Sequence, residues 1–312
     1  MGDPVTIALR FALYVDLIML FGLALFGLYS LKGQERVSGA VFNFESILVW
    51  AALIGTLLSV AAMLQMAKVM SGVSNFSEIH RHILEMILTG TDVGLTWIVR
   101  VAALVLAAIA ALFNRRAPTL SLLAVSALGA IALASLAWTG HGAMDEGILR
   151  YVHFTSDIAH LLGAGGWLGA LVAFVLLLRS KKLEGEQHLR LLSRTLTGFE
   201  TAGALIVISL TVTGIANYVL IIGPEIGGLV KSTYGFLLTI KVALFFAMLV
   251  LAAANRYHLS PLLDRSLQTG SYAPAINALQ RSIILEFAVA IVIVSLVAWF
   301  GTLSPEMDMA VE

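Results

Sequence analysis

The chain repeats one feature from end to end: stretches of about 20 mostly apolar residues, separated by short polar segments. A helix of about that length is needed to cross the hydrocarbon core of a bilayer. Of the 312 residues, 59% are hydrophobic and only 12% are charged, whereas about a quarter are charged in an ordinary soluble domain. The solvent for this fold is therefore lipid.

Breaks at glycine, proline and charge clusters divide the chain into eight predicted spans. They cover residues 7–31, 44–69, 92–113, 119–139, 153–178, 197–221, 236–255 and 282–303. The segment 74–90 is too polar to cross, but its apolar residues recur in helical rhythm, which predicts an interfacial helix between the second and third spans. No soluble linker or short repeat remains. We predict an all-α integral membrane protein, a bundle of about eight transmembrane helices, with residues 1–312 forming a single polytopic membrane domain.

The cations are distributed unevenly between the two sets of loops. One set carries twelve and the opposite set carries four. By the positive-inside rule the twelve-cation side is cytoplasmic, and an even number of spans then places both termini in the periplasm. The twelve are Lys32, Arg36, Arg115, Arg116, Arg179, Lys181, Lys182, Arg190, Arg194, Arg256, Arg265 and Arg281, and the four are Lys68, Arg81, Arg150 and Lys231.

Composition and missing motifs exclude several classes of function. Basic and acidic residues number 19 each, so no net charge points to nucleic acid. Cysteine is absent, which excludes disulfides, thiolate metal ligands and covalent c-type haem. The N-terminus lacks a cleavable signal pattern, so the first span is expected to stay in the mature protein. Phosphate-binding loops, H-E-x-x-H and nucleophile elbows are missing, so we do not expect an enzyme.

Histidines gather at the predicted periplasmic end, and three ionisable groups form a stripe there on the fifth span. At about 100° per residue, His153, Asp157 and His160 lie within about 40° of one direction, and Ala164 leaves space above them. Such groups face a bundle interior, a cavity or each other. The alternative is that Asp157 pairs with Arg100 or Lys241 from a neighbouring span, and that His160 binds a carbonyl.

The short loop before that span adds two further candidate ligands. It places His141 and Met144 after a small-residue turn and returns the chain directly to His153. Imidazole and thioether without thiolate suit copper, and methionine favours Cu(I). We therefore predict His141, His153 and His160 as imidazole ligands of copper, with Met144 and Asp157 as secondary ligands.

Other soft or polar groups at the same end have simpler interpretations. Met63, Met66 and Met70 form a stripe on the second span, which is more typical of packing than of metal ligation. His80 and His82 point to different faces of a helix, so at most one of them is a ligand, and a solvated pair fits equally well.

Five charged residues lie at membrane depth elsewhere in the predicted spans. They either line an exit path or pair with neighbours and hydrate at the interface, and the second interpretation is favoured. These residues are Arg10, Asp16, Glu45, Glu200 and Glu286.

Short blocks in order along nearly the whole chain complete the pattern. They are Gly140-His141, Asp157-x-x-His160-Leu161, Trp167-Leu168-Gly169, Tyr234-Gly235, Leu237-Leu238-x-x-Lys241, Asn255-Arg256, Arg281-Ser282 with Glu286, and Leu303-Ser304-Pro305. At this spacing the chain resembles the CopD/PcoD copper resistance membrane proteins. It departs from their pattern at Ala170, where a second Gly is common, and at Glu306, where a second Pro is common.

The resemblance implies a bacterial inner-membrane protein that handles copper and receives it from a periplasmic copper-binding partner of the CopC/PcoC type. Our interpretation is that the bundle accepts copper at its periplasmic end and passes it inward; the resemblance itself leaves import and efflux open. Two alternatives remain. A b-type cytochrome needs facing histidines on two spans, and a copper or respiratory assembly scaffold transports nothing.

Overall fold

The computed structural model describes residues 3–37, 39, 41–140, 147–179, 186–223, 233–269 and 272–303. Every regular element in these ranges is a helix, and eight helices are long and apolar enough to cross a membrane. The predicted all-α bundle of eight spans is confirmed. The first four crossing helices are α1 (Pro4–Ser30), α2 (Phe44–Ser71), α4 (Asp92–Leu112) and α5 (Pro118–Ala134), which continues as η3 (Ser135–Thr139). The last four are α6 (Gly147–Arg179), α7 (Glu186–Ile222), α9 (Thr233–Ala254), and α11 (Ala273–Phe300).

Several helices run beyond the apolar segments that predict them. Helix α7 begins at Glu186 rather than near residue 197, and α9 continues through the π-helix η5 (Asn255–Leu259) into α10 (Ser260–Thr269). Hydropathy detects only the part of a helix in lipid, whereas backbone hydrogen bonding carries the helix on through polar residues.

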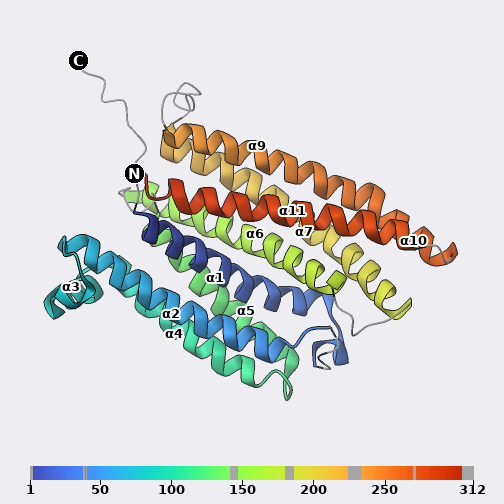
Figure 1. Cartoon of the computed structure of the whole chain (residues 1–312), viewed down its shortest axis with the longest axis horizontal. Coiled ribbons are helices and arrows are strands. Elements are labelled where there is room, and N and C mark those ends of the chain that lie inside the picture. Colours follow the sequence, from blue (N-terminus) through green and yellow to red (C-terminus); the bar gives the residue numbers. More distant parts are fainter. Residues whose placement is uncertain are drawn as a thin grey trace.

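The predicted interfacial segment forms η2 (Phe76–Glu78) and α3 (Arg81–Gly90), while η1 (Gly33–Arg36) connects α1 to α2. Figure 1 shows α3 at one end of the bundle, beside the ends of α2 and α4. Ile87 of α3 is fully buried in a small cluster with Met63 and Ala67 of α2. Its apolar face therefore packs on the end of the bundle, as an amphipathic helix requires.

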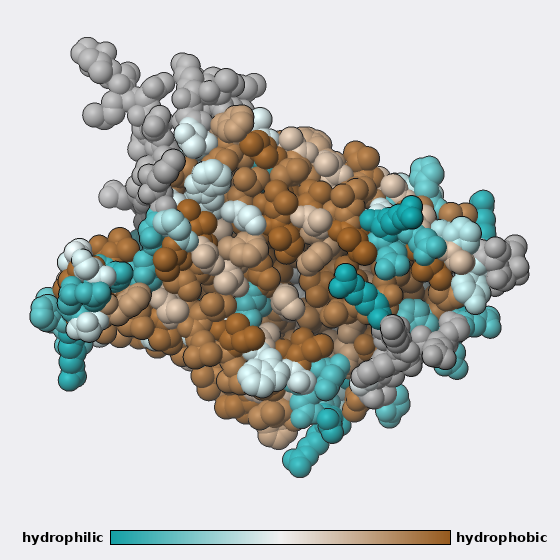
Figure 2. All heavy atoms as spheres, viewed as in Figure 1, coloured by the Kyte–Doolittle hydropathy of each residue, from teal (hydrophilic) through white to brown (hydrophobic). Residues whose placement is uncertain are grey.

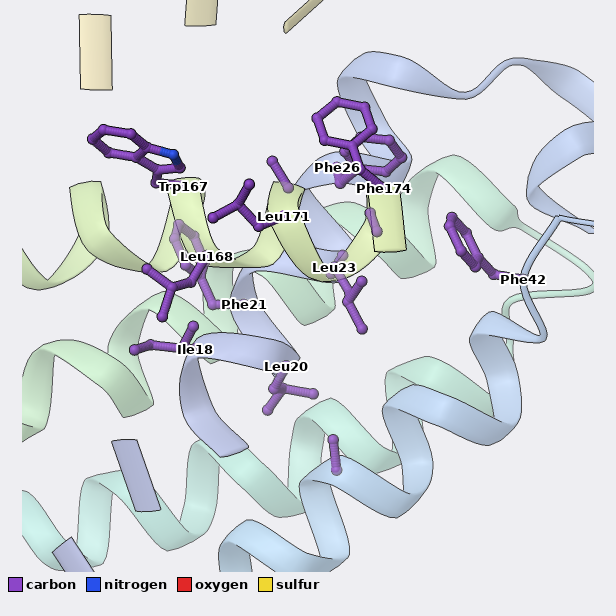
Figure 3. Packing of buried hydrophobic residues seen from close by; sticks show 14 of the residues in the cluster. Ile18, Leu20, Phe21, Leu23, Phe26, Phe42, Trp167, Leu168, Leu171 and Phe174 are labelled. Atoms are coloured by element: carbon purple, nitrogen blue, oxygen red, sulfur yellow. The ribbon is translucent and has the colours of Figure 1, made fainter. Parts of the chain in front are cut away.

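Helix α1 is the centre of the tightly packed part of the bundle. It contacts α2, α5 and α6, and α4 closes this group by packing on α2 and α5. A Cβ at Gly22 would lie 2.4 Å from the carbonyl oxygen of Gly165 and 2.6 Å from Cα of Gly169. Small residues thus bring α1 and α6 into backbone contact. Figure 3 shows the rings of Phe26 and Phe174 near one another further along this interface, with centroids 5.4 Å apart.

Hydrophilic residues lie at the two opposite ends of the molecule, with a hydrophobic belt between them (Figure 2). At one end, Arg115 lies 2.6 Å from Glu45 and Arg194 lies 2.6 Å from Glu35. These cations belong to the twelve-cation set, so we call this the inner end, following the positive-inside prediction. The start of α1 and the end of α11 meet at the other, outer end, where Arg10 touches Gly301.

Candidate functional site

A cavity of about 610 Å³ opens among α1, α6, α7, α9 and α11. Its walls are mainly apolar, and α7 and α9 scarcely touch each other in the described residues, so the cavity lies between two helices that are not packed together. Polar groups converge towards its outer end. They are Arg10, Tyr14, Asp157, His160, Asn217, Tyr218, Tyr234 and Lys241.

His160 faces this cavity in a defined orientation. Its Nδ1 lies 2.9 Å from Oγ1 of Thr213 on α7. The Thr213 hydroxyl already donates to the carbonyl of Ser209 at 2.6 Å, so it accepts from His160, which places the proton on Nδ1. No described residue hydrogen-bonds Nε2. The imidazole is thus held as the tautomer whose Nε2 lone pair is available in the cavity, the arrangement that metal-ligating histidines use.

Asp157 lies one helical turn further out and also lines the cavity. Its Oδ1 accepts from Nδ2 of Asn217 at 2.7 Å, a second contact from α7. His153 is one further turn out, with Nε2 3.8 Å from Oδ2 of Asp157, but it is 1% exposed and does not line the cavity. The predicted stripe therefore joins neighbouring side chains, while only Asp157, His160 and Ala164 border the cavity.

The other two predicted ligands, His141 and Met144, lie outside the described residues. The described chain stops at Gly140, immediately before His141. Gly140 lines the cavity, and a Cβ built on it would lie 3.6 Å from Oδ2 of Asp157. The last described residue before His141 therefore lies beside the Asp157 carboxylate.

Two cations at membrane depth test the alternative interpretation of Asp157. Arg100 is turned away from it and donates to Oγ of Ser135 at 2.7 Å. Lys241 lines the same cavity as Asp157 and interacts with it electrostatically, and its Nζ lies 5.6 Å from the centroid of the Phe300 ring. The interpretation that Asp157 pairs with Arg100 is thus wrong. Lys241 interacts with Asp157 electrostatically, while the hydrogen bond of Asp157 comes from Asn217.

Within the described residues, no group of three or more His, Asp or Glu side chains converges tightly enough to enclose a metal ion. His160 also has no histidine facing it from another described helix, since its partner is Thr213. The described part of the site therefore offers a carboxylate and an imidazole as an open pair.

The methionine stripe on α2 and the two histidines near α3 lie where packing and solvation, respectively, would place them. Met63 is buried and Met66 half-buried against α3, whereas Met70 is exposed. His80 and His82 are both exposed at the start of α3. These positions fit packing and solvation.

The membrane-depth charges divide into paired and unpaired groups. Glu45 pairs with Arg115, and Glu200 lies 3.7 Å from Arg256, as the favoured interpretation expects. Asp16 is 9% exposed, lies against Gly55, and keeps Oδ2 without a hydrogen bond in the described structure. Arg10 donates to the carbonyl of Thr139 at 3.4 Å and has no ion-pair partner among the described residues.

Glu286 is different because neutral groups hold it. Nε1 of Trp167 donates to Oε1 at 2.7 Å, and Nδ2 of Asn255 donates to Oε2 at 2.8 Å. Trp167 also lines the cavity, and Figure 3 shows its ring on the side of α6 opposite Phe21. Trp167 therefore connects the cavity to the buried carboxyl below it.

Sequence reasoning missed the α7 side of the site. Thr213 and Asn217 are one turn apart on α7 and contact His160 and Asp157, which are three residues apart on α6. A polar pair at i and i+4 in an otherwise apolar span was the available signal. Met248 of α9, a thioether in the cavity wall, was also missed.

Comparisons with known proteins agree with this architecture. Residues 1–152 match the family description "Copper resistance protein D-like, N-terminal domain", and residues 193–300 match "Copper resistance protein D". The chain is 56% identical over 308 residues, 99% of both chains, to copper resistance protein D of Pseudomonas syringae pv. tomato. It is 27% identical over 305 residues, 96% of this chain and 98% of the relative, to inner membrane protein YebZ of Escherichia coli (strain K12). No solved structure matches. The chain belongs to the copper resistance protein D family and is a multi-pass, copper-related membrane protein.

Proposed function

We propose that this protein transports copper across the bacterial inner membrane, accepting it at the outer end of the cavity and passing it inward. The orientation of His160 carries the proposal, because Thr213 fixes the imidazole with its Nε2 lone pair available in the cavity. Copper is the substrate and imidazole is one of its preferred ligands. Asp157 supplies a carboxylate one turn away.

The proposed outer site consists of His141, His153, Asp157 and His160 with Met144. The position of Gly140 beside Asp157 supports a role for the loop, since the next residue is His141. We propose a soluble periplasmic copper-binding partner of the CopC/PcoC type as donor, which transfers copper by ligand exchange at this open pair.

Lys241 lowers the affinity of the proposed site for copper. A cation near Asp157 and His160 opposes the positive charge of an arriving copper ion. The site is therefore suited to weak, exchangeable binding. Below it, the thioether of Met248 offers a soft ligand in the cavity wall.

The test is copper uptake into proteoliposomes of known orientation, measured for both Cu(I) and Cu(II). We expect His160→Ala to abolish uptake in protein that still folds, and Thr213→Val, which leaves Nδ1 unheld, to reduce copper binding by about 10- to 100-fold. His82→Ala, a change at an exposed histidine, is the matched control. Normal uptake by folded His160→Ala protein contradicts the proposal, and absence of flux in every variant, including the wild type, favours a scaffold.

A further inference from the structure

Glu286 occupies a place that the proposed copper site does not use. It lies on α11, is 3% exposed, and is separated from the cavity by Trp167, which lines the cavity while Glu286 does not. Ionisable residues inside a membrane bundle are costly and mark ion or proton pathways. The function of this carboxyl therefore requires an explanation of its own.

No described cation neutralises the Glu286 carboxyl. Arg256 of η5 is directed to Glu200 of α7, at 3.7 Å from its carboxylate and 3.4 Å from its carbonyl oxygen. Asp264 of α10 bonds to Ser193. On the other helices packed against α11, the charged or titratable cavity groups lie towards the outer end of the cavity, and Asp16 lies against Gly55 of α2. The charged or titratable groups nearer the inner end, Arg179, His258, Arg265 and Arg281, are exposed. Among the described residues, the influences on the Glu286 carboxyl are burial and its hydrogen bonds from the neutral groups of Trp167 and Asn255.

Asn255 matches both protonation states of this carboxyl. Its Nδ2 donates to Oε2 of Glu286, as an ionised carboxylate requires, and its Oδ1 is buried without a hydrogen-bond partner in the described structure. A half-turn of the amide presents Oδ1 instead, which accepts from a protonated Glu286. The Trp167 N–H donates to Oε1 in either state. The site thus satisfies the carboxylate and the carboxylic acid alike.

We propose that Glu286 is a reversible proton-binding site at the inner end of the copper cavity. The O–H bond at Oε2 forms as a proton arrives from water on the inner side and breaks as it returns; no electron moves. The proton route runs from Glu286 past Asn255, the first residue of the π-helix η5, to the half-exposed ion pair of Arg256 and Glu200. Local π-helices recur at functional sites.

The site deepens the proposed transport function, on which its coupling to copper rests. Hydrogen bonds to an ionised carboxylate are about twice as strong as those to a neutral acceptor. Protonation of Glu286 therefore loosens Trp167 at the cavity wall. Because coupling between two sites is reciprocal, copper moving past Trp167 changes the proton affinity of Glu286.

Infrared difference spectroscopy on copper-free protein in vesicles tests proton binding independently of transport. In the wild type we expect the C=O band of a carboxylic acid, shifted in D2O, to grow as pH is lowered and to disappear reversibly as pH is raised. Glu286→Gln should remove the band, and Glu45→Gln, at a glutamate that is ion-paired with Arg115 and lies outside the proposed route, should keep it. If Glu286→Gln does not fold, Asn255→Leu provides a second test. It removes the amide oxygen that accepts from protonated Glu286, and is therefore expected to shift the C=O band.

An unchanged band in both Glu286→Gln and Asn255→Leu, or no titrating band in the wild type, overturns the proposal. A pH-sensitive dye inside copper-transporting proteoliposomes then tests the coupling: wild type should move protons with copper, and Glu286→Gln should not. If the wild type moves no copper but the infrared band titrates, the transport function fails while the proton site stands.

Discussion

The two parts of this bundle are built on opposite packing rules. Each crossing helix contains an apolar window of 18 residues. The share of this window that is buried inside the molecule is 61% in α1 and α6 and 56% in α5, but only 11% in α7 and α9. The tight part joins its helices through glycines, while α7 and α9 face lipid and border the cavity. Helix α6 belongs to both, since one face packs on α1 and another carries Asp157 and His160. A tightly packed wall thus carries the proposed ligands Asp157 and His160, and loosely packed helices surround the space through which copper is proposed to move.

The largest expected effect comes from separating α1 and α6. A Cβ at Gly169 would lie 2.3 Å from Cα of Gly22, so Gly169→Ala should cost more than the roughly 1–3 kcal/mol of ordinary overpacking, because two backbones must move apart. Gly198→Ala on α7 is the control, since nothing lies within 4 Å of its added Cβ. Thermal unfolding and folded yield in detergent measure the difference. Equal melting temperatures for Gly169→Ala and Gly198→Ala would contradict the view that α1 and α6 are packed more tightly than α7.

A second pair compares the two faces of α6. Ala170 is 0% exposed in the packed core, and Ala170→Leu should lose about 1–3 kcal/mol of stability. Ala164 lines the cavity, so Ala164→Leu has space for its side chain and should change stability by about 0.5 kcal/mol or less. The same unfolding assay decides, and a larger loss for Ala164→Leu means that the cavity is closed in solution.

The two membrane-depth cations sharpen the comparison further. Arg100→Met leaves Ser135 without its buried donor and should cost about 1–3 kcal/mol of stability while leaving copper binding unchanged. Lys241→Met should leave stability nearly unchanged and raise copper affinity several-fold, because a cation near Asp157 is removed. Copper titrations measure the affinity and unfolding curves measure the stability of each variant. A stability loss in Lys241→Met without a change in copper affinity would mean that Lys241 has a structural role.

The smallest effect concerns the first turn of the tight part. Hydrogen bonds from Thr6 lower the pKa of Asp3 below its ordinary value, and Asp3 also accepts from Gln65 on α2 at 2.7 Å. The stability due to this depressed pKa is present above the ordinary pKa and is lost as pH falls through the folded-state pKa. Asp3→Ala should therefore lower the melting temperature slightly at neutral pH, and the difference from wild type should vanish in acid. A difference that persists unchanged in acid assigns the effect to something other than the ionised carboxylate.

Some parts of the site were predictable because they depend on one helix alone. Asp157 and His160 share a face of α6 since the helical period fixes their directions, and Ala164 borders the same cavity. His153 belongs to the same stripe but is buried outside the cavity, because the width of the cavity depends on α7 and α9 rather than on α6. The ligand roles of His141, His153 and His160 stay predictions.

By itself the sequence determined the eight spans, the interfacial helix and the uneven distribution of cations, because hydropathy and helical period are local properties. Only the tertiary structure decided that Thr213 orients His160, that Asn217 binds Asp157, and that Trp167 meets Glu286, 119 residues later. Those partners depend on how each helix is rotated and tilted against its neighbours. Packing across the whole bundle selects that rotation and tilt, and no single apolar segment encodes them.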